Sequence, residues 1–206
     1  MAQNKMNFYE VINKRRTIRQ FDQEEIPKEV LERIINAGLK APTGGGKKDV
    51  ELVIITEKDI ILDLAKFINP SPYKIKEPKT LQQEMLKIAH PLQKSMVEES
   101  TCVILVVYKQ KHEFSDTPNN FGLQEYASAW TLIENILLAA TYEGLGTGIH
   151  VPVQKEVQQI KEFMNIPYNY YFPAMIMLGY TAENAVLPKQ IEPDVNSIVH
   201  WNKFKK

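Results

Sequence analysis

The stretch "NKRRTIRQFD" (residues 13–22) places four cationic side chains within six consecutive positions near the start of the chain. The 206-residue chain has no formal net charge, because 25 Lys and Arg residues balance 25 Asp and Glu residues, so the cluster is a local feature. Two apolar residues, Ile18 and Phe21, interrupt the charges. Side chains alternate between faces in an extended segment, so we expect Ile18 to point away from Thr17 and Arg19. This concentration of charge at one bend raises the question of which anion it meets.

The residues of this basic cluster permit three interpretations. Cations in the last turn of a helix offset the helix dipole, so the cluster could be a solvated helix end. A nucleic-acid surface is the second interpretation, although such surfaces are usually broader and include aromatic platforms. A phosphate clamp is the third, because Arg side chains bind phosphate oxygens in a bidentate manner and the hydroxyl of Thr17 adds a donor. Spacing by itself does not choose among them.

Composition predicts a single soluble domain. A chain of 206 residues with 44% hydrophobic content is long enough to bury a substantial core. Its single cysteine, Cys102, excludes an internal disulfide framework and suits a reducing compartment. We see no secretory signal in "MAQNKMNFYE", and the longest apolar run, "CVILVVY", is too short to span a bilayer. We therefore expect a cytoplasmic protein without nucleic-acid or membrane partners.

Hydrophobic periodicity predicts helices that alternate with a few strands, which favours an α+β fold without internal repeats. The run 101–108 is apolar throughout and is expected to be buried on both faces of a sheet. The predicted helices cover 7–15, 27–38, 56–67, 80–98, 122–142 and 153–165, and the other predicted strands cover 50–56 and the residues after Pro173 up to 180.

Two glycine-rich stretches are ambiguous. "APTGGGKK" (41–48) could bring the backbone close to a ligand, or it could be a flexible connection. It is not a P-loop, because Ala41 stands where the first glycine of that motif belongs and a helix precedes it. "GLGTGIH" (144–150) does not match the dinucleotide-binding pattern and follows a helix instead of opening one.

Four segments follow one another in order along nearly the whole chain: "VINKRRTIRQFD", "IINAGLKAPTGGG", "ENILLAATYEGLGTG" and "PAMIMLGYTAENAVLPK". Taken together, they resemble the nitroreductase family of flavoproteins. The resemblance implies a single α+β domain over 1–206 with a nitroreductase-like fold, in which helices flank a central mixed β-sheet. It also implies a homodimer with FMN at the subunit interface, and we expect the C-terminal arm, about 186–206, to pack on the partner subunit.

Carried over position by position, the resemblance implies a set of FMN-binding residues. Arg15 and Lys189 would hold the phosphate, and Thr17 would serve the ribityl-phosphate region. Arg19 would lie at the pyrimidine edge, where it stabilises the charge of the reduced ring. The 42–46 loop would come from the partner subunit. The full set is Arg15, Arg16, Thr17, Arg19, Pro42, Thr43, Gly44, Gly46, His150, Val151 and Lys189.

Some positions depart from the family pattern. The loop continues as "GKKDV" instead of Asn-x-Gln-Pro-Trp, and Ile191 stands where some members have a second basic residue. The backbone around His150 and Val151 is expected near flavin N5 and O4. Pro152 has no N–H to donate, so Val151 is the expected donor to N5. Lys47 and Lys48 could hold a 2′-phosphate or remain solvated.

The resemblance implies an FMN-dependent oxidoreductase that uses NADH or NADPH. Hydride would pass through flavin N5 to nitroaromatic, quinone or similar acceptors by a ping-pong scheme, without a side-chain acid, base or nucleophile. The four histidines show no metal-ligand spacing. Aromatic candidates for the acceptor pocket are Tyr73, Phe121 and Tyr126. The alternatives are a flavin-dependent dehydrogenase or dehalogenase on the same fold, and a flavin-binding module without useful turnover.

Overall fold

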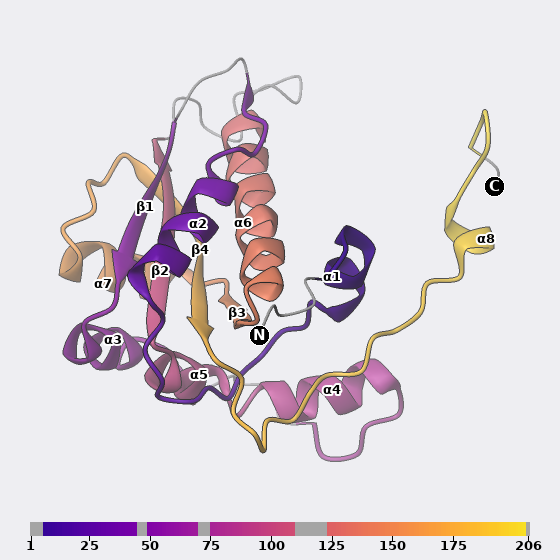
Figure 1. Ribbon diagram of the computed structural model, residues 1–206, viewed down its shortest axis with the longest axis horizontal. Coiled ribbons are helices and arrows are strands. Elements are labelled where there is room, and N and C mark those ends of the chain that lie inside the picture. The colour runs from indigo at the N-terminus through magenta and orange to yellow at the C-terminus, as the bar shows by residue number, and fades with distance from the viewer. Residues whose placement is uncertain (1–5, 45–48, 70–74, 110–122, 205–206) are drawn as a thin grey trace.

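The fold is built on one four-stranded antiparallel sheet, seen in a computed structural model that describes residues 6–44, 49–69, 75–109 and 123–204. The strand order is β1-β2-β4-β3, so β1 and β3 form the two edges (Figure 1). The strands are β1 (Val50–Ile55), β2 (Cys102–Lys109), β3 (Gly146–His150) and β4 (Tyr170–Gly179). The helices are α1 (Phe8–Lys14), α2 (Lys28–Gly38), α3 (Lys58–Ala65), α4 (Leu81–Ala89), α5 (Gln93–Glu99), α6 (Gln124–Tyr142), α7 (Gln154–Phe163) and α8 (Val195–Ile198). The expected α+β fold is therefore confirmed.

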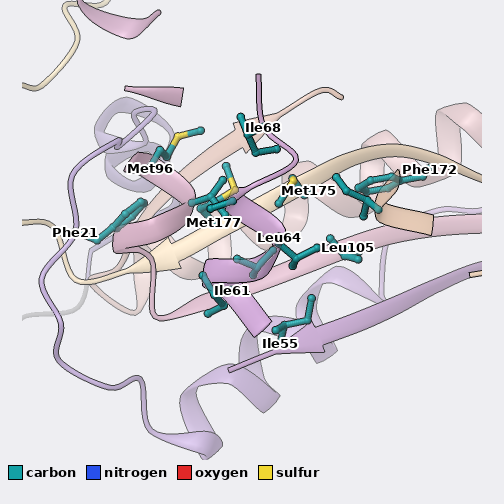
Figure 2. Packing of buried hydrophobic residues seen from close by; sticks show 14 of the residues in the cluster. Phe21, Ile55, Ile61, Leu64, Ile68, Met96, Leu105, Phe172, Met175 and Met177 are labelled. Carbon is teal, nitrogen blue, oxygen red and sulfur yellow. The ribbon is translucent and has the colours of Figure 1, made fainter. Parts of the chain in front are cut away.

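Helices cover both faces of the sheet, which explains why β2 is apolar throughout. Alternate residues of β2 pack against α2 and α6 on one face, and Ile104 belongs to this cluster. The residues between them, including Leu105, pack on the other face against α3 and α5, as Figure 2 shows, and also against α7. Seven consecutive residues of β2 are buried for this reason. Among the described residues, no helix is long and apolar enough to cross a bilayer.

Two of the expected elements differ from the structure, in both cases next to a proline. The helix expected over 80–98 is divided into α4 and α5, because Pro91 lacks the N–H that a continuous helix would need. The last strand begins at Tyr170, upstream of Pro173. The strand tolerates Pro173 because the register of β2 and β4 shifts between Val106 and Tyr108, where a bulge removes the regular ladder.

Residues 15–22, which we call the arginine segment, cross the edge of the sheet at β3. Thr17 forms an isolated parallel bridge with Thr147 outside the named strands. The four strands themselves all pair antiparallel, so the sheet differs in this respect from the mixed sheet that we expected. The N–H of Ile18 donates to the Thr147 carbonyl at 2.8 Å. The side chains of Ile18 and Phe21 are only 6% and 4% exposed. The two apolar residues therefore anchor the segment and leave its polar side chains on the other side.

Glycines in β3 and β4 make room for this anchor. A Cβ atom at Gly148 would lie 2.7 Å from the carbonyl oxygen of Ile18, and one at Gly146 would lie 2.9 Å from its Cγ1. At Gly179 a Cβ would lie 2.9 Å from the ring of Phe21. Real Cβ atoms do not approach so closely, so only glycine lets the arginine segment lie against the sheet.

The residues after β4 form an arm that leaves the body of the molecule. Figure 1 shows it running past α4 to the isolated helix α8. Trp201 and Phe204 are 77% and 79% exposed, and other apolar side chains of the arm are also more than half exposed. Exposed apolar side chains of this number indicate an interaction surface.

We expect Gly148→Ala to destabilise the fold by about 1–3 kcal/mol, because the added methyl group meets backbone that cannot rotate away. Urea unfolding measures the difference. Gly146→Ala is the matched comparison and should cost less, because its methyl group meets the side chains of Ile18 and Thr181, which can adjust. Equal stability of Gly148→Ala and wild type would contradict this account of the strand edge.

Candidate functional site

The arginine segment begins where α1 ends, and both ends of this helix are set by its own residues. Asn7 and Glu10 form a reciprocal capping box at its start. Arg15 is the C-cap residue and has extended backbone angles, so the chain turns away from the helix there. The guanidinium of Arg16 donates to the carbonyls of Asn13 and Arg15 at 2.5 and 2.8 Å. The helix-end interpretation therefore applies to Arg16.

Arg15 makes a much weaker interaction. Its Nε lies 3.8 Å from Oε1 of Glu134 on α6, and the side chains are 29% and 54% exposed. Surface pairs of this kind contribute between zero and about 1 kcal/mol. Arg15 is thus held near α6 with most of its donor capacity available to a ligand.

Arg19 is the least satisfied cation of the cluster. Its Nε is buried and finds no hydrogen-bond partner among the residues that the structure describes. Burial lowers the pKa of its guanidinium below the ordinary value. A half-buried cation with an unused donor fits an anionic or electron-rich ligand at this position.

The start of the C-terminal arm lies directly against the arginine segment. The N–H of Ala182 donates to the backbone carbonyl of Gln20 at 3.1 Å, and the N–H of Val186 donates to its side-chain oxygen at 3.0 Å. Lys189 follows three residues later and is exposed. The structure therefore brings the start of the C-terminal arm to the arginine segment, while the expected proximity of Lys189 to Arg15 stays a prediction.

The predicted partner-derived loop packs against the first half of α6. The N–H of Gly44 donates to Oγ of Ser128 at 3.2 Å, and Thr131 donates to the carbonyl of Pro42 at 3.3 Å. These contacts hold the loop, including Thr43, on that part of the helix. The arginine segment meets α6 further along, where Arg15 lies beside Glu134, and Thr17 then pairs with β3, which follows the end of α6 (Figure 1). The two groups of predicted residues therefore contact different parts of α6.

Several predicted residues lie outside the part of the chain that the structure describes. These are Gly46, Lys47, Lys48, Tyr73 and Phe121. The remaining acceptor candidate, Tyr126, is half-buried and packs edge-on against Trp130 and Tyr171, with ring centroids 6.1 and 6.0 Å away.

A polar network at the end of β3 was not predicted from the sequence. His150 is 9% exposed, and its Nε2 lies 2.9 Å from Oε2 of Glu156 on α7. The same oxygen accepts from the N–H of Val153 at 3.0 Å. The other oxygen, Oε1, accepts from the N–H and the side-chain amide of Asn69 at 2.8 and 3.2 Å. The only sequence signal was the position of Glu156 in the first turn of a helix that closely follows a histidine.

Glu156 is ionised in this network. Burial by itself would raise the pKa of its carboxyl, but the hydrogen bonds from Asn69, His150 and Val153 outweigh burial, and the pKa lies below its ordinary value. Val151 and Val153 are 57% and 58% exposed, so the turn between β3 and α7 faces outward while the network holds it from beneath. The side chain of His150 thus points into the protein, at the end of the strand that pairs with β4.

Within the described residues, no three His, Cys, Asp or Glu side chains gather in a way that could hold a metal ion. The geometry instead offers a basic segment on an edge strand, one unsatisfied arginine, and an exposed turn fixed by a buried carboxylate.

Comparison with known proteins identifies the family. The sequence profile of the Nitroreductase family matches residues 12–180, so the chain belongs to this family. It is 26% identical over 201 residues to a protein of Methanothermobacter thermautotrophicus named as an NADH dehydrogenase/NAD(P)H nitroreductase, covering 96% of this chain and 90% of that protein. It is 24% identical over 192 residues to iodotyrosine deiodinase 1 of Sus scrofa, covering 91% of this chain and 66% of that enzyme.

A solved structure supports the same fold. The NADPH:FMN oxidoreductase of Vibrio harveyi, complexed with NAD+, matches with a TM-score of 0.72 at 22% identity, covering 98% of this chain and 79% of that chain. The expected nitroreductase-like fold is therefore confirmed, and membership of the family indicates an oxidoreductase.

The hydrogen bonds to Glu156 predict how stability depends on pH. Because the pKa of this carboxyl is lower in the folded state than in the unfolded state, its ionised form stabilises the fold above the unfolded pKa. That contribution is lost as the pH falls through the folded pKa. We expect Glu156→Gln to unfold at a lower urea concentration than wild type near pH 7, and the difference to shrink between about pH 5 and about pH 3.

The control for this measurement is Glu162→Gln, which changes an exposed carboxyl on the same helix and should shift the midpoint little. A gap between Glu156→Gln and wild type that stays constant over this pH range would show that the carboxylate charge is not what stabilises the network.

Proposed function

We propose that the protein is an FMN-dependent NAD(P)H oxidoreductase that passes hydride to a nitroaromatic, quinone or related acceptor. The observation that supports this most strongly is the unsatisfied, half-buried Arg19 within a basic segment anchored on β3. FMN carries a phosphate dianion and a ring that becomes anionic on reduction, and these two groups match the two kinds of cation in the segment.

Each cation has a distinct task in this proposal. Arg15 and Lys189 bind the phosphate, and Thr17 donates to the ribityl-phosphate region. Arg19 stabilises negative charge at the pyrimidine edge, because a preorganised cation in a partly buried position needs no reorganisation when that charge appears. Arg16 completes the basic surroundings while it caps α1.

When bound, FMN supplies the hydride chemistry, and the protein supplies binding and orientation. The exposed turn at Val151 presents backbone to the ring, and Val151 is the proposed donor near N5. Nucleotide and acceptor use the same face in turn, which gives ping-pong kinetics. The NAD(P)H nitroreductase and NADPH:FMN oxidoreductase names of the relatives support a nicotinamide donor without choosing between NADH and NADPH.

The described surface supports a homodimer in which each site uses both chains. The loop at Pro42 and Gly44 contacts the first half of α6, whereas Thr17 pairs with β3 beyond the end of that helix, and in this proposal a second copy completes each site. A groove of about 590 Å³ between α1, α2 and α6 is mostly apolar, and Phe8 at its edge is 65% exposed. Together with the exposed arm from about residue 186, it would be covered in a dimer.

A dehalogenase on the same fold is the second candidate. It is favoured by the match to iodotyrosine deiodinase 1 over 91% of this chain.

An anaerobic experiment decides between the two candidate functions. Purified protein should be yellow, NADH or NADPH should bleach it, and a nitroaromatic or quinone should restore the colour. Recovery with a halogenated aromatic but not with these acceptors would favour the dehalogenase, and colourless protein that takes up no FMN would overturn both.

Arg15→Ala should weaken FMN binding by roughly 2–5 kcal/mol, because truncation leaves the phosphate charge without one of its partners. Fluorescence titration of the flavin-free protein measures the change. Lys28→Ala removes an exposed cation at the start of α2 and should leave the affinity unchanged. Unchanged affinity in Arg15→Ala would remove this residue from the phosphate site.

Removal of residues 187–206 should convert the dimer to monomers and abolish FMN binding, because the arm loses its contacts with the partner. Sedimentation and flavin content report the two effects. Lys189→Ala separates them, since it keeps the arm and should lose FMN affinity while remaining a dimer. A truncated chain that stays a flavin-loaded dimer would contradict the proposed role of the arm.

A further inference from the structure

We propose that His150 is held as an imidazolium between two acceptors, and that its buried ion pair with Glu156 is the device that positions the β3–α7 turn. The protonation state stands on hydrogen-bond geometry. Only the consequence for flavin reduction rests on the function proposed above.

The imidazole ring of His150 lies between two hydrogen-bond acceptors. The side-chain N–H of Gln93 donates to the carbonyl of Ala89 at 3.1 Å, which orients the amide so that its oxygen faces Nδ1 of His150 at 3.3 Å. On the other side, Nε2 lies 2.9 Å from a carboxylate oxygen of Glu156. A neutral imidazole has one N–H, so it can satisfy only one of these two acceptors. An imidazolium satisfies both.

The carboxyl group of Glu156 is surrounded by hydrogen-bond donors, and this determines its charge. Each of its two oxygens receives two donors: His150 and the N–H of Val153 at Oε2, and two groups of Asn69 at Oε1. A protonated carboxyl would direct its own hydrogen at one of these donors. The carboxylate is therefore ionised, and the cation that balances it is His150.

Both side chains of the pair are buried. His150 is 9% exposed and Glu156 is 2% exposed, so each charge depends on the other. The ionisable group that faces the imidazole is Glu156 from α7, while α5 presents the neutral amide of Gln93, and Asn69, after α3, is also neutral. A pair of this kind has few alternative arrangements, which makes it a rigid junction.

The junction joins four parts of the fold at one point. His150 ends β3, Glu156 and the N–H of Val153 belong to the start of α7, Gln93 lies on α5, and Asn69 follows α3. The turn at Val151 is exposed and has this network beneath it. His150 and Glu156 are therefore positioning residues, which act on the flavin through the backbone of the turn. Misplacement of a reacting group by about 1 Å can cost on the order of a hundredfold in rate.

The protonation of His150 can be tested without flavin. Nitrogen-15 NMR at about pH 7.5, where an isolated imidazole is mostly neutral, reports whether one or both ring nitrogens of His150 carry hydrogen. His150→Gln identifies the signal. Two N–H groups are expected, and a single N–H would overturn the proposal. This result holds even if the protein binds no FMN, so it is independent of the proposed function.

The second arm measures positioning in the flavin-loaded protein. The side chain in Glu156→Gln offers only one acceptor oxygen. We therefore expect flavin reduction by saturating NADH or NADPH to slow by about tenfold, with the rate counted per bound flavin. A purely structural role would lower the flavin content and leave this rate unchanged, which would overturn the positioning role. Glu162→Gln on the same helix is the control and should match wild type.

A third variant keeps the test decisive if Glu156→Gln does not fold. His150→Gln retains a neutral donor for Glu156 but removes the cation, and it should fold with a rate between those of wild type and His150→Ala. A rate equal to wild type in His150→Gln would show that the ion pair is not needed.

Discussion

The contact between Ile18 and the glycines of β3 is the constraint on which the candidate site depends. The arginine segment has too few apolar residues to form an element of its own, and it is ordered because Ile18 and Phe21 are buried against the sheet edge. That burial requires strands without side chains at Gly146, Gly148 and Gly179. The same contact orients the polar side chains of the segment away from the core. Charge in this protein is therefore positioned by an apolar interaction.

The basic cluster divides its cations among different tasks. Arg16 satisfies carbonyls at the end of α1, Arg15 makes a weak surface pair with Glu134, and Arg19 is half-buried with an unused donor. The helix-end interpretation therefore holds for Arg16, whereas the anion site remains a prediction that the unused donor of Arg19 supports. The difference arises from burial, because a solvated guanidinium needs no protein partner whereas a buried one does.

Periodicity predicted the elements whose residues face the core in a regular pattern. Strand β2 and helix α6 were identified because each has a long apolar pattern of the right period. Strand β3 was missed because two of its five residues are glycines, which carry no hydrophobic signal. The break between α4 and α5 was missed although Pro91 was visible, because the apolar spacing continued on both sides of it. The Glu156 network was missed because Asn69 and Gln93 lie tens of residues from His150 and Glu156 in the sequence and meet them only in the folded chain.

The sequence by itself determined the α+β class, the principal helices and strands, and the family, because these follow from local patterns and from motifs in a fixed order. Tertiary structure alone decided which arginine lacks a partner, that the 42–44 loop packs on the first half of α6, and that His150 turns inward to Glu156. The physical reason is that burial and hydrogen-bond partners are properties of segments that meet in space. Residue types and their spacing along the chain do not record which segments those are.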